Sequence, residues 1–243
     1  MTRSAYLRYE ALRHFRNVRF VIFSLAWPLI LFFAVAGPQR RHTFDGIGFP
    51  LYFMTGMAVF GTLIAVISAG AGIAAERSLG WTRQLRITPL RAGAYLGAKL
   101  LCGYFMAFLT IVVLCLSGTA LGVWLSAGQW LTVFGLLLIG LAPFAVLGIL
   151  LGHLLTTDSL TPVVGGITTL FALVGGAYGF LIATSGAVFE VIKGLPSYWL
   201  VQAGKTALRG GGWPAEGWIV IAVWTIVLAG VAAGVHRRHT SRA

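Results

Sequence analysis

Residues 76–91 read ERSLGWTRQLRITPLR and separate two long apolar runs of the chain. A charge at the centre of a bilayer costs roughly 2.5–3.5 kcal/mol on insertion scales, so this stretch, with its four arginines and one glutamate, must lie in water or at the membrane interface. The residue before a proline is displaced from helical backbone angles, so a helix that begins near Gly80 should end at about Ile87. Pro89 suits the first position of a following helix, with Thr88 as its N-cap. The stretch therefore predicts a short helix, a break and a new helix between two membrane spans; an ordinary basic loop that only fixes topology is the alternative.

The composition of the whole chain identifies an integral membrane protein. Hydrophobic residues make up 58% of the 243 residues and charged residues only 10%, and the mean hydropathy is +0.88. Soluble domains carry roughly 25% charged residues. The net charge of +12 comes from basic residues that cluster beside apolar runs, as they do in cytoplasmic loops of membrane proteins, so it does not indicate nucleic-acid binding. Cys102 and Cys115 lie about 20 Å apart along one predicted helix, too far for a disulfide.

The apolar runs predict an all-α fold in a single transmembrane domain over residues 1–243. Six runs are long enough to cross a bilayer, which takes roughly 20 residues. Residues 1–19 place aromatic and aliphatic residues at helical spacing among arginines, which predicts a basic amphipathic helix at the membrane surface; a solvated helix is the alternative. The predicted spans are 20–37, 50–75, 99–123, 130–155, 160–182 and 218–235. Four Gly-xxx-Gly pairs could permit close packing between them, namely Gly118/Gly122, Gly148/Gly152, Gly175/Gly179 and Gly230/Gly234.

The segment 184–215 has apolar runs too short to span a membrane. Pro196 and Gly210 stand where a helix start and a helix end prefer proline and glycine. We expect two short helices, at about 186–193 and 196–209, that dip back toward the membrane from the outer side.

The distribution of lysine and arginine predicts the orientation. With the N-terminus inside the cell, 13 of these residues lie in inner segments and five in outer loops. Because cytoplasmic loops carry the excess of positive charge, both termini and the stretch 76–91 are predicted to be cytoplasmic.

Few residues of this chain could support chemistry of their own. The polar segments hold no glycine-rich phosphate loop with its lysine and no serine–histidine–acid set. His153 and Asp158 are the one thin candidate for an ion or proton site. No predicted span carries a charge near its centre, which argues against a proton- or ion-driven pump. A passive channel, a membrane-embedded enzyme and a membrane anchor that only recruits an ATPase remain as alternatives.

The pattern resembles the permease of a type-2 ABC exporter, and the daunorubicin-resistance-like and sodium-export-like half transporters in particular. The resemblance covers the whole chain. It is carried by the N-terminal basic helix, the six spans, the pattern Glu-Arg-x-x-Gly-x-x-x-x-Leu-Arg-x-Thr-Pro-Leu at 76–90 and the pattern Leu-Pro-x-Tyr-Trp at 195–199. Members of the family usually have a second acidic residue and a threonine near Leu79-Gly80-Trp81, whereas Ser78 and Trp81 stand here.

The resemblance implies a function that depends on other subunits. Residues 76–90 would form a coupling helix seated in a groove of a separate ABC ATPase, present in two copies, and a second permease of the same or a related chain would complete the path. ATP and Mg²⁺ would bind the ATPase, so this chain would hold no cofactor or metal and would not be an enzyme by itself. The implied coupling residues are Glu76, Arg77, Gly80, Trp81, Arg83, Leu85, Arg86, Thr88, Pro89 and Leu90. The implied outer gate or re-entrant residues are Leu195, Pro196, Tyr198 and Trp199.

Two further expectations concern Glu76 and the substrate. Glu76 could pair with Arg77, with Arg83 or with a partner residue, and we expect it to stabilise the hairpin between the second and third spans. Glu76→Gln should then uncouple ATP turnover from export without preventing insertion. The apolar spans favour an amphiphilic drug, a natural product or a lipid-like molecule, moved outward across a bacterial plasma membrane; the path residues are not assigned.

Overall fold

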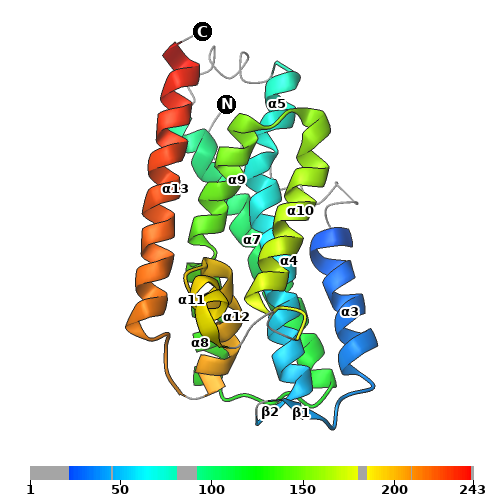
Figure 1. Cartoon of the computed structure of the whole chain (residues 1–243). Helices are drawn as coiled ribbons and strands as arrows, with labels where there is room; N and C mark the ends of the chain where they lie inside the picture. Colours follow the sequence, from blue (N-terminus) through cyan, green and yellow to red (C-terminus); the bar gives the residue numbers. More distant parts are fainter. Residues whose placement is uncertain (1–21, 45, 81–91, 180–184, 209, 242–243) are drawn as a thin grey trace.

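A computed structural model describes residues 22–241 of the chain apart from 45, 81–91, 180–184 and 209. The predicted helix 1–19 and the residues from Trp81 to Arg91 lie outside the described part. Within it the fold is a bundle of helices that run roughly side by side (Figure 1). This confirms the all-α fold class.

Five stretches of the described chain are long and apolar enough to cross a membrane. They correspond to α4 with α5, then α7, then α8 with α9, then α10, and finally α13. Their bounds are Phe49–Ala71 for α4, Ile73–Ser78 for α5, Ala92–Ala120 for α7, Ala127–Gly140 for α8, Ala142–Leu154 for α9, Thr157–Gly175 for α10 and Ala215–Ser241 for α13. The multi-pass membrane architecture therefore agrees with the prediction.

The first predicted span, 20–37, is represented by a shorter apolar helix. A π-helical turn, η1 (Ile22–Ala26), runs into α3 (Trp27–Ala36). Pro28 lies in the first turn of α3, directly after the π-helical turn, so the helical hydrogen bond that a proline cannot make is missing where the helix changes from π to α. The total of six spans stays a prediction.

Two helix boundaries and one loop differ from the prediction. The helix α7 begins at Ala92 rather than 99, so Lys99 lies inside a helix and not at its start. The helix α10 ends at Gly175 rather than 182, because Gly176 adopts a left-handed backbone conformation (φ 84°) that terminates it. The predicted polar loop after α3 contains a small antiparallel hairpin of β1 (Thr43–Phe44) and β2 (Ile47–Gly48), for which the Asp-Gly sequence at 45–46 was the available signal.

The helix α4 forms the centre of the bundle. Of the most apolar 18-residue stretch in this span, 83% is buried, against 6% of the corresponding stretch of α13. The helix α4 packs against α3, α7, α9, α10 and α12. A glycine permits the close approach of α4 to the turn after α10: a Cβ added to Gly56 would lie 1.9 Å from the carbonyl oxygen of Ala177. Gly148 and Gly152, one of the predicted Gly-xxx-Gly pairs, meet the backbone of α4. A Cβ on Gly230 or Gly234 would have no neighbour within 4 Å, so no close helix packing in the described chain requires this pair.

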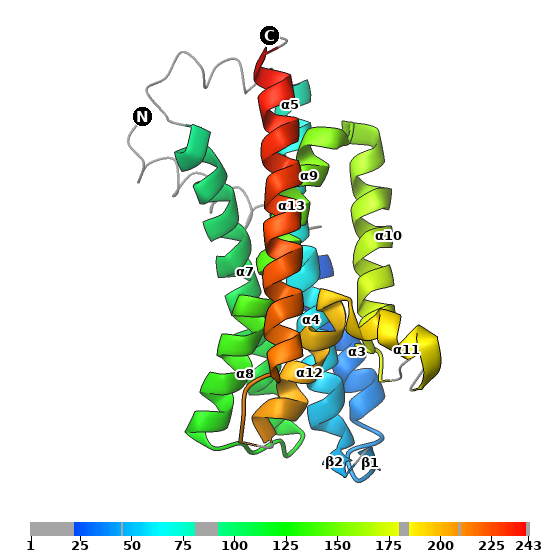
Figure 2. The ribbon, with the colours of Figure 1, turned by 60° about the vertical axis from the view of Figure 1, so that its left-hand side comes forward.

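The segment before α13 forms the two short helices that the sequence predicts. They are α11 (Gly186–Lys193) and α12 (Pro196–Leu208). Figures 1 and 2 place them in the half of the bundle that holds the β1–β2 hairpin, here called the hairpin end. The opposite end, here called the α5 end, holds α5, the start of α7, the turn between α9 and α10 and the end of α13.

Candidate functional site at the junction of α5, α7 and α9

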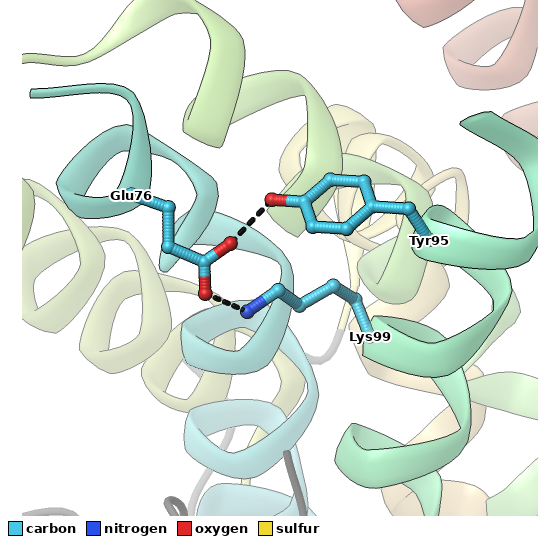
Figure 3. Close-up of polar contacts among 3 residues, drawn as sticks. All are labelled: Glu76, Tyr95 and Lys99. Carbon is cyan, nitrogen blue, oxygen red and sulfur yellow. Dashed lines mark hydrogen bonds and ion pairs between the residues drawn. The ribbon is translucent and has the colours of Figure 1, made fainter. Parts of the chain in front are cut away.

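The α5 end contains a buried ion pair between two helices. The carboxylate of Glu76 on α5 accepts a hydrogen bond from the ammonium group of Lys99 on α7, with 2.5 Å between Oε1 and Nζ. The two side chains are 1% and 2% exposed. The hydroxyl of Tyr95, one helical turn before Lys99, donates to the other carboxylate oxygen of Glu76 at 2.5 Å (Figure 3). Because residues four apart share one face of a helix, α7 presents both donors to Glu76 together.

The next residue of α5 makes its contacts with a different helix. The guanidinium of Arg77 donates to the carbonyl oxygens of His153 and Leu155, the second at an N–O distance of 3.2 Å. The last carbonyls of a helix lack helical partners, and a cation near them is electrostatically favoured. Arg77 therefore stabilises the end of α9 and ties it to α5.

A third contact joins α5 to α10. The Thr157 hydroxyl, in the first turn of α10, donates to the Ser78 hydroxyl at 2.9 Å. Three consecutive residues, 76, 77 and 78, thus bind three different helices. The end of α5 is the point where α7, α9 and α10 are held together.

The ion pair is the strongest electrostatic feature of this junction. Removing one partner of a buried pair typically destabilises a protein by about 3–5 kcal/mol, because the other charge is left buried without compensation. The Tyr95 hydrogen bond satisfies the second carboxylate oxygen, so neither oxygen lacks a donor. Both oxygens of the carboxylate are therefore hydrogen-bonded although the site is closed to solvent.

A shallow cavity of about 460 Å³ opens beside the junction. It is lined by Ala74, Arg77, Ser78, Thr156, Thr157 and Asp158. Asp158 is exposed in the first turn of α10, whereas His153 is buried with its Nδ1 at 2.8 Å from the Ile149 carbonyl oxygen. Within the described ranges, no group of three or more His, Cys, Asp or Glu side chains could hold a metal ion.

The structure describes three of the predicted coupling residues. Glu76 and Arg77 lie in the junction, and Gly80 follows with a left-handed backbone (φ 70°). The remaining seven lie outside the described residues: Trp81, Arg83, Leu85, Arg86, Thr88, Pro89 and Leu90. The sequence suggested Arg77, Arg83 or a residue of a partner protein as the partner of Glu76. Arg77 binds the end of α9 instead, and Lys99 and Tyr95 bind Glu76. Pairing with Arg83, which lies outside the described residues, or with a partner protein stays a prediction.

Sequence reasoning missed Tyr95 and took Lys99 only as an inner cation at the start of the third predicted span. A signal was nevertheless present. Lys99 stands four residues after Tyr95 and inside an apolar run, where an unpaired charge is costly. A lysine in that position requires an acidic partner at the same depth, and Glu76 ends the preceding apolar run.

The predicted outer residues lie together at the hairpin end. Pro196 begins α12, and the Trp199 indole N–H donates to the Lys193 carbonyl oxygen of α11 at 2.7 Å. The rings of Tyr198 and Trp199 meet edge to face with centroids 5.1 Å apart, and Leu195 precedes them in the turn. In α11 itself, a hydrogen bond with Glu190 raises the pKa of Lys193. These contacts fix α11 to α12; a gating role for them stays a prediction.

The comparison with known proteins identifies the family. The family model described as "ABC-2 family transporter protein" matches residues 43–235, which is more than half of the chain. The chain belongs to the ABC-2 transporter family. This ABC-2 permease is also 26% identical over 204 residues to the "Putative transport permease YvfS" of Bacillus subtilis (strain 168), a match that covers 83% of each protein. The resemblance seen in the sequence is thereby confirmed, and membership of this family implies in general that the permease pairs with an ATPase subunit.

Proposed function

We propose that this ABC-2 permease is the membrane-spanning subunit of an ATP-driven exporter and that residues 76–91 couple it to the ATPase. The observation that carries the proposal is the buried cluster of Glu76, Tyr95 and Lys99. Glu76 lies just before the stretch 81–91 and the other two residues lie just after it. One cluster therefore holds both ends of the stretch, so a force applied to it reaches α5 and α7 together.

The energy for transport comes from the partner. The chain has no phosphate loop, so ATP and Mg²⁺ bind the ATPase, which is present in two copies. A second permease, of the same or a related sequence, completes the path. The exposed sides of α13 are apolar, with Ile219, Val223 and Ile226 about half exposed or more, and they contact membrane lipid.

The transported molecule is amphiphilic: a drug, a natural product or a lipid-like compound. The spans are strongly apolar: the mean hydropathy of their most apolar 18-residue stretches lies between 1.3 and 2.6. Such spans disfavour a hydrated ion as the transported molecule. The α5 end faces the cytoplasm of a bacterial cell, and the hairpin end with α11 and α12 faces outward. The excess of lysine and arginine in the segments of the α5 end supports this orientation.

The decisive experiment is extraction of the tagged permease from its native membrane in mild detergent, followed by mass spectrometry of the proteins that accompany it. We expect a stoichiometric ATPase subunit. Replacing Arg83 and Leu85 by aspartate should remove it, whereas Arg41→Asp, a charge reversal at the exposed hairpin end, should not. Recovery of the wild-type permease alone, under conditions that keep other membrane complexes intact, would refute the exporter and favour a channel.

A further inference from the structure

We infer that Glu76 and Arg77 are positioning residues that transmit movement inside the permease, and that the ATPase docks on residues beyond them. The inference rests on the proposed function. It divides the stretch 76–90, which matches the family pattern as one unit, into a part that holds the helices and a part that binds the partner.

The first observation is that Glu76 is fully engaged within the chain. One carboxylate oxygen binds the ammonium group of Lys99 and the other binds the hydroxyl of Tyr95, each at 2.5 Å. The side chain is 1% exposed. Because the site is closed to solvent, a residue of the ATPase could reach this carboxylate only by displacing a donor that already binds it.

The second observation is that Arg77 points to a different helix. Its guanidinium binds the carbonyl oxygens of His153 and Leu155 at the end of α9. A surface arginine kept for an acidic partner would not need these contacts. Because adjacent residues of a helix point in directions about 100° apart, the pair Glu76-Arg77 can bind α7 and α9 from a single turn of α5.

The third observation is that the side chains of Ser78 and Leu79, directly after Arg77, are exposed to solvent, whereas Glu76 is buried. Leu79, three residues after Glu76, is 76% exposed, although it is a large apolar residue at the α5 end. Gly80 then turns the chain with a left-handed backbone. The boundary between the positioning part and the docking part therefore lies at Ser78 and Leu79.

These observations predict two different classes of variant. Loss of the ion pair should leave the ATPase bound, but nucleotide binding by the ATPase should no longer be coupled to the positions of α5 and α7. Loss of the exposed part should remove the ATPase. By thermodynamic linkage, if permease conformation and nucleotide binding are coupled, the permease shifts the affinity of the ATPase for ATP, typically by about 5–150-fold.

The experiment uses the complex of permease and co-purified ATPase in lipid nanodiscs. It measures the ratio of ATPase to permease, and the affinity for a fluorescent ATP analogue with Mg²⁺ relative to the free ATPase subunit. For Glu76→Gln, Lys99→Met and the double variant, we expect the wild-type ratio with at least a fivefold reduction of the affinity shift. The double variant removes both charges of the pair together, so it reports on coupling even if a single variant folds poorly. For Leu79→Asp, we expect loss of the ATPase.

The matched control is Glu190→Gln, which breaks the other salt bridge of the described chain, between Glu190 and Lys193 on α11. This variant should change neither the ratio of ATPase to permease nor the shift in ATP affinity. Exchange of the two charges, Glu76→Lys with Lys99→Glu, should restore part of the affinity shift, which a loss of fold would not allow.

Three results would overturn the inference. The ion-pair variants could lose the ATPase as Leu79→Asp does, which would place Glu76 in the docking surface. They could keep both the ratio and the affinity shift, which would leave the pair a purely structural role. A wild-type permease that binds the ATPase without shifting its affinity would refute transmission, whereas a wild-type permease without any ATPase would refute the proposed function itself.

Discussion

Replacing Lys99 by methionine tests how strongly the buried ion pair holds the junction. Methionine preserves most of the side-chain volume but removes the charge, and the carboxylate of Glu76, 1% exposed, then loses its ammonium partner while the Tyr95 hydrogen bond stays. Breaking one side of a buried pair costs about 3–5 kcal/mol. At roughly 2–4 °C per kcal/mol for chains of this size, the apparent melting temperature should fall by about 6–20 °C.

The assay is thermal unfolding of the purified permease in one detergent, followed by tryptophan fluorescence. The cycle is completed by Glu76→Gln and by the double variant. Replacing both members of a buried ion pair by uncharged residues often changes stability little. The melting temperature of the double variant should therefore fall by much less than the two single decreases added together. The control Lys193→Met removes a pair at the solvent-exposed surface, where water screens the charges, and should lower the melting temperature far less than Lys99→Met does. Single losses that simply add, or a Lys99→Met protein that melts like wild type, would refute this reasoning.

Three further predictions follow from other contacts. Tyr95→Phe removes a hydrogen bond to a charged group and should cost about 1.5–3 kcal/mol, measured in the same melting assay against Tyr104→Phe; a loss no larger than that of this control would contradict the role of its hydroxyl. Gly148→Leu should prevent folding into a monodisperse protein in size-exclusion chromatography, because a Cβ there already lies 2.6 Å from the Ile67 carbonyl oxygen, whereas Gly230→Leu should not. In a cysteine-free background, Arg41→Cys should react with a membrane-impermeant maleimide on intact cells and Leu79→Cys only after the membrane is opened; the reverse would overturn the orientation.

The sequence was sufficient to predict the elements whose signals are local. The bounds of α11 and α12 followed from proline and glycine at the ends of short apolar runs, and these residues act through their own backbone angles. The long helices followed from the hydropathy of the runs, because a bilayer leaves backbone polar groups no partner except within a helix. The end of α10 at Gly175 was missed, since an apolar run continues past the left-handed glycine that stops the helix.

The candidate site could be predicted only in part because its contacts join distant segments. Glu76 was singled out from its place at the edge of an apolar run. Its partner Lys99 lies 23 residues further along, and the pairing depends on how α5 and α7 are rotated toward each other. The bonds of Arg77 to α9 span 76 and 78 residues. Their acceptors are backbone carbonyls, which every residue carries, so no side-chain pattern marks them.

The energetic cost of burying the charges of Glu76 and Lys99 suggests that the ion pair serves a purpose other than stability. In a packed interior, apolar residues of similar volume usually stabilise a fold as well as an ion pair does. A salt bridge between Glu76 and Lys99 is therefore a poor means of gaining stability alone. The pair instead fixes the relative position of two helices. Two donors on one face of α7 bind the carboxylate, so α5 can neither shift along α7 nor rotate against it without breaking a hydrogen bond. The coupling that we propose for residues 76–91 would need that fixed geometry to pass a movement to two spans, whereas an apolar contact would allow the helices to slide.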